Sequence, residues 1–215
     1  MKLIFKKSVI LFSIIALSFS ANSQSLKQKV ADKYFDQLDF KKAVEVYEDI
    51  VSGKGKDYHS LKRTAECYRF MNDNVKAELW YKSVIEFGTN IPKDYYNYSQ
   101  LLKSNGKYEL SDVNMKLFYQ KAGKGTFTSV PNFYEKLKQD SIYFMVNSVD
   151  CNSSKSDMAP VIYNNELIFV SNRSVRGLKE VKVGWDNTGF LEIYNSGLRD
   201  SIVKPIPFFG EDLTK

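Results

Sequence analysis

The pattern that decides the fold is found in three stretches of the chain: residues 40–52 (FKKAVEVYEDIVS), 74–86 (NVKAELWYKSVIE) and 108–120 (YELSDVNMKLFYQ). They begin 34 residues apart and align without a gap. Each has a small residue at its fourth position, a large one at its eighth and an apolar one at its eleventh. Because steps of three and four residues return to the same face of an α-helix, we expect three equivalent helices.

The residues before each stretch repeat with the same step. The matching positions are Ala31, Ala65 and Ser99, and Tyr34, Tyr68 and Leu102. Small residues suit places where two antiparallel helices approach closely, and large apolar residues fill the spaces between them. Turn residues, Asn72-Asp73 and Asn105-Gly106, separate the helices of a pair. The sequence therefore predicts three helical hairpins, since a generic amphipathic bundle gives no reason for a constant step.

This pattern resembles the tetratricopeptide repeat family, whose helix–turn–helix unit is about 34 residues long. The family's early tryptophan is absent, and the equivalent residues are Lys27, Leu61 and Tyr95. Its terminal proline is also missing, and Gly53 and Gly55 occupy the first turn between repeats. The third repeat has serines at two alanine positions, and terminal repeats of a stack are often degenerate in this way.

The resemblance implies that the first helix of each pair lines a concave surface that binds a partner. Carrying over the family's positions gives a set that we call the predicted groove residues: Gln28, Asp32, Phe35, Asp36, His59, Lys62, Glu66, Arg69, Phe70, Tyr96, Gln100 and Lys103. Aromatic residues among charges are typical of interface anchors with a polar rim. The alternative is that these residues form a solvated face, or that Phe35 and Phe70 pack against a neighbouring helix.

The pattern changes after residue 122. The segment Ala122–Thr126 has the composition of a linker, and a short helix is expected over Pro131–Lys138. Alternating and β-branched residues then predict strands. The predicted strands are Ser141–Val146, the two arms of Pro160–Ser171 joined by a turn at Asn164-Asn165, and Gly189–Tyr194.

Residues 147–194 resemble the entry to a periplasmic WD40-like β-propeller. The resemblance is carried by Asn147-Ser148, Ser156–Pro160, Ile168–Arg173, Trp185 and Phe190–Tyr194, with Glu192 where the family usually has aspartate. A propeller has four to eight blades of about 40–50 residues, so this region cannot close a ring. Either the chain is part of a longer protein, which we favour, or its strands form an incomplete sheet with exposed edges.

The expected fold class is α+β in two domains: an α-α superhelix of about three hairpins, followed by an incomplete all-β, propeller-like segment. The predicted organisation is a signal peptide over residues 1–23, the helical repeats over 24–122, a linker with a short helix over 123–139 and the strand region over 140–215.

The first 23 residues have the features of a secretory signal. Lys2, Lys6 and Lys7 precede the apolar run Ser8–Phe19, and small residues follow at Ala21–Ser23. The run would form a helix of roughly 18 Å, shorter than the ~30 Å core of a membrane, so an uncleaved anchor is the less favoured alternative. Without this segment the net charge of +6 falls to +3, which does not indicate binding to nucleic acid or an anionic membrane.

The sequence lacks the usual signatures of catalysis. There is a single histidine, His59, and neither a nucleophile elbow nor a phosphate-binding loop occurs. Cys67 and Cys151 could form a disulfide if their Cα atoms lay within about 7 Å. We favour the alternative in which Cys67 is a buried apolar residue and Cys151 a surface thiol. We therefore expect no enzyme activity, cofactor or metal.

The order of signal, helical repeats and propeller is similar to the start of Bacteroidetes outer-membrane proteins of the OmpA family, which are associated with type IX secretion and gliding. This resemblance implies an outer-membrane-associated periplasmic scaffold that binds protein partners in the cell envelope. It would reach the cell wall only through a domain that lies outside this chain. The alternative function is a propeller-based ligand or glycan binder in which the helices are a spacer.

Overall fold

The computed structural model describes residues 26–53, 56–129, 133–173 and 182–206. The predicted signal peptide lies outside the described residues. The chain divides into two compact units: a helical unit, residues 1–129 with 184–186, and a sheet unit, residues 130–183 with 187–215. The two-part α+β layout expected from the sequence is confirmed, and each unit is described by itself.

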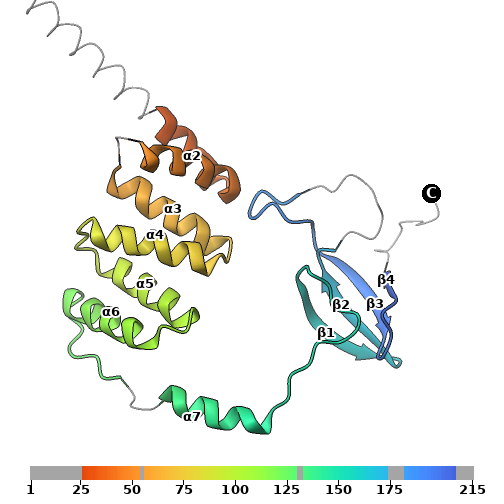
Figure 1. Cartoon of the computed structure of the whole chain (residues 1–215). Coiled ribbons are helices and arrows are strands. Elements are labelled where there is room, and N and C mark those ends of the chain that lie inside the picture. Colours follow the sequence, from red (N-terminus) through yellow and green to blue (C-terminus); the bar gives the residue numbers. More distant parts are fainter. Residues whose placement is uncertain (1–25, 54–55, 130–132, 174–181, 207–215) are drawn as a thin grey trace, which may run out of the picture. The chain divides into compact units, whose positions relative to one another are not determined.

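Six helices follow one another along the described part of the helical unit (Figure 1). They are the helical residues 26–36, α2 (Phe40–Ser52), α3 (Tyr58–Phe70), α4 (Asn74–Glu86), α5 (Pro92–Ser104) and α6 (Tyr108–Lys121). Successive helices from α2 to α6 pack against one another, and residues 26–36 contact α2 through the Phe35–Phe40 and Asp32–Tyr47 pairs. The six helices therefore form three consecutive hairpins (Figure 1). No described helix is long and apolar enough to cross a membrane.

The 34-residue step is preserved in the backbone. Helices α2, α4 and α6 begin at Phe40, Asn74 and Tyr108, and α3 and α5 also begin 34 residues apart. The turn inside each hairpin has one residue of positive φ: Leu38 (60°), Asn72 (61°) and Gly106 (75°). After it, the backbone N–H of Asp39, Asp73 and Lys107 donates to the carbonyl of Tyr34, Tyr68 and Leu102, respectively, at 2.8–2.9 Å. This left-handed turn satisfies carbonyls at the end of the first helix.

The N-termini of the second helices show where the third hairpin departs from the other two. The Asp39 and Asp73 side chains accept hydrogen bonds from backbone N–H groups in the first turns of α2 and α4. At the third hairpin the same position is Lys107, which caps nothing with its side chain. Its ammonium instead lies 2.6 Å from the buried carboxylate of Glu78 on α4, so it ties the third hairpin to the second.

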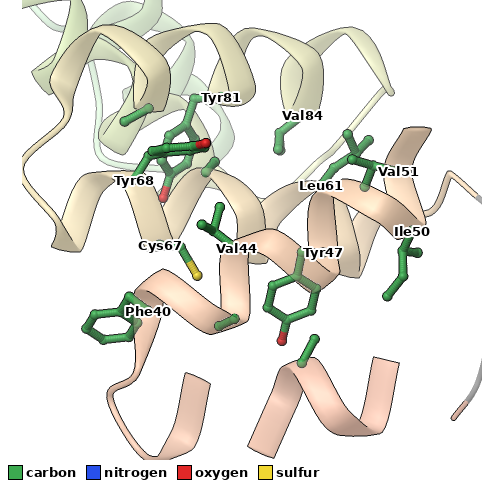
Figure 2. Close-up of a cluster of buried hydrophobic side chains, with 14 of the residues drawn as sticks. Phe40, Val44, Tyr47, Ile50, Val51, Leu61, Cys67, Tyr68, Tyr81 and Val84 are labelled. Carbon is green, nitrogen blue, oxygen red and sulfur yellow. The ribbon is translucent and has the colours of Figure 1, made fainter. Parts of the chain in front are cut away.

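The core follows the aligned positions of the repeat (Figure 2). The small residues at the helix contacts are all buried: Ala31, Ala43, Ala65, Ala77, Ser99 and Ser111. The tyrosines at the eighth position of α2 and α4, Tyr47 and Tyr81, are fully buried, and Val44 and Leu61 pack in the same cluster. The predicted role of the small residues is therefore confirmed in all three hairpins. The predicted burial of the large residues holds in α2 and α4 but not in α6, where Met115 and Phe118 are only half-buried.

The sheet unit contains a short helix and a four-stranded antiparallel sheet. Its elements are α7 (Phe133–Asp140), the 3₁₀ helix η1 (Ser141–Tyr143), β1 (Asp157–Tyr163), β2 (Glu166–Ser171), β3 (Glu192–Gly197) and β4 (Val203–Pro205). The strands are paired in the order β1-β2-β3-β4. Asn164 and Asn165 both have positive φ, so the predicted tight turn between β1 and β2 is confirmed.

Three sequence-based expectations for this unit are wrong. Ser141–Val146 is not a strand: it forms η1 and then continues without regular structure. A run of apolar residues does not make a strand unless its backbone finds a ladder partner, and this run has none in the described structure. The third strand begins at Glu192 and extends to Gly197, rather than ending at Tyr194. Cys151 is buried rather than a surface thiol.

The two faces of the sheet differ in how well they are covered. Phe169 of β2 and Tyr194 of β3 are paired across the strands and buried together with Cys151. On the opposite face, Val161 and Tyr163 of β1 are apolar but about 60% exposed. A sheet with apolar residues on both faces and an open β1 edge matches the expected incomplete sheet.

Candidate functional site

The predicted groove residues lie on residues 26–36, α3 and α5, the first helices of the three hairpins. The structure brings two pairs of them together across neighbouring hairpins. His59 Nε2 lies 2.7 Å from Asp32 Oδ1, and the rings of Phe35 and Phe70 have centroids 6.0 Å apart. Residues far apart in the sequence therefore share one surface at the first two hairpins.

Asp32 is the centre of a polar cluster on this surface. The hydroxyl of Tyr47 donates to Asp32 Oδ1, the same oxygen that faces His59. Burial alone would raise the pKa of Asp32, but the hydrogen bonds from Tyr47 and His59 lower it below its ordinary value. Burial and the bond to Asp32 also raise the pKa of Tyr47, so its hydroxyl remains a donor. The cluster fixes the Asp32 carboxylate and leaves it partly accessible.

Phe35 and Phe70 are part of the hydrophobic core rather than isolated surface anchors. Both pack on the buried ring of Phe40, with centroid distances of 5.2 Å and 4.7 Å. A guanidinium group lies over each ring: Arg63 is 4.1 Å from the Phe35 centroid, and Arg69 is 4.4 Å from that of Phe70. Both rings are therefore already in contact with other side chains of the chain.

Lys62 forms an ion pair that was not predicted from the sequence. Its ammonium lies 3.0 Å from Asp94 Oδ1 of α5, and Asp94 is fully buried. The other carboxylate oxygen accepts hydrogen bonds from Tyr58 (2.6 Å) and Thr89 (2.8 Å). Burial would lower the pKa of Lys62, but the bonds to Tyr58 and Asp94 raise it above its ordinary value. Lys62 therefore joins the second hairpin to the third.

The remaining predicted groove residues have lighter contacts. Glu66 accepts a hydrogen bond from Arg63 at 3.1 Å, on the same helix. Gln100 is half-buried, while Asp36 and Lys103 are exposed. Tyr96 does not join the cluster of the first two hairpins; it contacts Phe118 of α6, with centroids 5.3 Å apart. The surface thus has a tightly bonded region at α3 and a more open one at α5.

The sheet unit contains a cavity of about 410 Å³, lined mainly by apolar side chains. Residues on its walls include Val149, Cys151, Met158, Ile162, Leu167 and Phe169. The volume is in the range typical of small-molecule sites. It is therefore the second feature of the chain that could hold a ligand.

Arg173 holds two residues of the cavity wall, Cys151 and Asp157, in place. It donates to Asp157 (2.6 Å) and to the backbone carbonyl of Cys151 (2.8 Å), so it holds the loop before β1 against the sheet. Burial would raise the pKa of Asp157, but hydrogen bonds from Arg173, Ser171 and Ser153 hold it at about 2. The serine and arginine of the segment Ile168–Arg173, singled out in the sequence, therefore have structural roles.

The described residues contain no group of three or more histidine, cysteine, aspartate or glutamate side chains that could hold a metal ion. Burial raises the pKa of the Cys67 thiol to about 12, so the thiol stays protonated at neutral pH. Both cysteines are free thiols. Asp32 and His59 form a hydrogen bond that the buried Tyr47 joins as a third member.

Comparison with known proteins gives no further guidance. No protein-family model matches the chain, and no curated protein matches it. Function is therefore inferred from the geometry of the two units and from the resemblances in the sequence.

Proposed function

We propose that this protein is a non-enzymatic scaffold that holds a protein partner on the face formed by residues 26–36, α3 and α5. The proposal rests on one observation, the constant 34-residue spacing of the three hairpins. In a stack of equivalent hairpins, the same face of each first helix is presented side by side, which creates an extended surface.

Several side chains on this face are held in place before any partner binds. Asp32 is fixed by Tyr47 and His59, and Glu66 by Arg63. A partner that contacts fixed side chains loses less conformational entropy on binding than one that must order flexible ones. This arrangement supports recognition of a protein rather than chemistry on a small substrate.

The cellular setting of the proposal rests on the sequence. The signal-like residues 1–23 support export, and the order of helical repeats before strands supports kinship with the N-terminal part of OmpA-family periplasmic proteins. In this setting the protein is a periplasmic, outer-membrane-associated component of the type IX secretion or gliding machinery. Contact with the cell wall would be made by a domain outside this chain.

Site-specific photo-crosslinking in cells that export the full protein tests the proposal. A photoreactive residue replaces Asp36 or Gln100, which lie on the proposed face outside the hydrophobic core. Matched controls carry the same residue at Lys41 of α2 or Lys82 of α4, which are exposed on the second helices. We expect the same protein adduct from both test positions and none from the controls. Equal adducts at all four positions, or adducts only at the controls, would contradict the proposal.

The cavity in the sheet unit favours a second candidate, a ligand- or glycan-binding protein in which the helices are a spacer. Replacing Met158 with tryptophan in the full chain would fill part of the cavity without changing the helices. If that change abolished glycan binding while substitutions at Asp36 and Gln100 left it intact, this candidate would replace the scaffold.

A further inference from the structure

A cluster of lysines on aromatic rings lies at the end of the third hairpin opposite its turn, where α5 begins and α6 ends. Each of three lysine ammonium groups lies within about 5 Å of a ring centroid, a distance typical of cation–π contacts. The pairs are Lys93 with Tyr96 (4.7 Å), Lys121 with Tyr95 (5.1 Å) and Lys124 with Phe118 (5.1 Å). We call these six residues the lysine–aromatic patch. They come from the first turn of α5, the last turns of α6 and the segment after α6.

The rings of the patch continue into a row of contacts. Tyr96 contacts Phe118 (5.3 Å between centroids), Phe118 contacts Tyr119 (5.5 Å), and Tyr119 contacts Phe127 (5.5 Å). All four rings are half-buried. The row therefore gives the lysines a fixed base, because each ring is held by its neighbours.

The three lysines are exposed, and within the described residues no carboxylate forms an ion pair with any of them. Lys121 donates only to the amide oxygen of Asn90, at 3.2 Å. Residues 90–128 contain six lysines and three acidic residues, and one of those acids, Asp94, is buried and paired with Lys62. This end of the stack is therefore positively charged although the whole chain is only moderately basic.

The helix dipoles explain the position of only one of the two helical lysines in the patch. Lys121 lies in the last turn of α6, where the helix dipole favours a cation. Lys93 lies in the first turn of α5, where the dipole disfavours one. In the described part of the chain these three cations gather without a carboxylate partner, and one of them lies against the helix dipole. This arrangement indicates a surface that is completed by a negatively charged partner.

We propose that the lysine–aromatic patch binds an acidic segment of a partner protein. The ring geometry selects this occupant over a nucleic acid or a sugar. Stacking of bases or sugars needs open, flat ring faces. Here successive rings are tilted by 57°, 87° and 50°, and three ring faces are already covered by lysine ammonium groups. The groups available to a ligand are therefore the lysine ammonium groups and the apolar ring edges between them.

An acidic peptide fits both features. Its carboxylates would pair with Lys93, Lys121 and Lys124, and its apolar side chains would contact the edges of the half-buried rings. Apolar contacts flanked by charge pairs are typical of protein interfaces. Tyr96 belongs to the predicted groove, whereas the three lysines and Phe118 do not, so this binding site extends past the proposed groove onto α6 and the segment after it.

Fluorescence anisotropy with the full chain tests the proposal. The probe is a labelled glutamate-rich peptide with interspersed phenylalanines. The test variant carries Lys93→Gln, Lys121→Gln and Lys124→Gln, and the matched control carries Lys29→Gln, Lys33→Gln and Lys56→Gln, exposed lysines elsewhere in the helical unit. We expect the test variant to lose affinity about tenfold or more and the control to keep it, with weakening by salt in both. A variant with arginine at the three patch positions should keep binding.

Three results would overturn the proposal: no binding of the peptide to the native chain, equal loss in the control variant, or tighter patch-dependent binding of single-stranded DNA or a polyuronate oligosaccharide than of the peptide. Circular dichroism of each variant separates loss of binding from loss of fold, since the substituted lysines are exposed and helical content should not change.

Discussion

The Lys62 ammonium of α3 lies 3.0 Å from the Asp94 carboxylate of α5, and Asp94 is fully buried between the hairpins to which the two helices belong. A buried carboxylate is tolerated only where its oxygens are paired, and here Tyr58 and Thr89 hold the second oxygen. The junction between the second and third hairpins therefore depends on a polar network as well as on apolar packing.

Asp94→Asn should destabilise the helical unit by roughly 2 kcal/mol, because it leaves the Lys62 ammonium partly buried without a counter-charge. The measurement is urea denaturation followed by circular dichroism at 222 nm. Asp36→Asn on an exposed site is the matched control and should change the free energy of unfolding by less than about 0.5 kcal/mol. Equal stability of the two variants would show that the ion pair contributes nothing.

How far the sequence predicts this fold depends on whether a feature repeats. The hairpin register could be predicted because the small residues at Ala43 and Ala77 mark the same helix contact in successive units. The Lys62–Asp94 pair could not be predicted in this way. The residue 34 positions before Asp94 is Ser60, and the residue 34 positions after Lys62 is Tyr96, so the pair has no equivalent in the neighbouring repeats.

The sheet unit shows the other limit of sequence reasoning. The tight turn at Asn164-Asn165 is a local feature and could be predicted. The burial of Cys151 could not, because it depends on a loop held in place by Arg173, 22 residues further along the chain. The predicted strand Ser141–Val146 failed for a similar reason, since a strand exists only with a partner.

Leu38→Gly should stabilise the helical unit by about 0.5–1 kcal/mol, because Leu38 has a φ of 60° and glycine adopts this conformation without the steric cost of a Cβ. The equivalent residue of the third hairpin is already Gly106. Thermal denaturation is the measurement, and the gain should appear as a higher midpoint.

The reverse substitution, Gly106→Leu, is the control for the same physical cause. A Cβ added at Gly106 would meet nothing within 4 Å, so any loss of stability arises from the backbone conformation alone. We expect a loss of about 1 kcal/mol. If Gly106→Leu were neutral, strain at the positive-φ turn would not explain a gain from Leu38→Gly.

The thiols of Cys67 and Cys151 should react slowly with maleimide in the folded protein, because both side chains are at most 5% exposed. Cys67 should be the slower of the two, since its pKa is raised to about 12 and almost no thiolate is present at pH 7. Mass spectrometry after timed labelling gives the two rates. Fast labelling of both sites without denaturant would contradict the burial of these residues.

Asp157 should make the stability of the sheet unit depend on acidic pH. Its pKa is lowered from 3.8 to about 2 in the folded state, so its ionised form is stabilised by folding. The resulting stabilisation is fully present above pH 3.8 and is lost as the pH falls through about 2. The stabilisation amounts to at most about 2 kcal/mol.

Urea titrations followed by the amide signals of β2 and β3, from about pH 5 to about pH 2, would measure this pH dependence. Asp157→Asn should lower stability at neutral pH and flatten this part of the pH profile, whereas Asp200→Asn, at an exposed position after β3, should leave the profile unchanged. A profile that Asp157→Asn does not alter would show that the Arg173 pair does not stabilise the sheet.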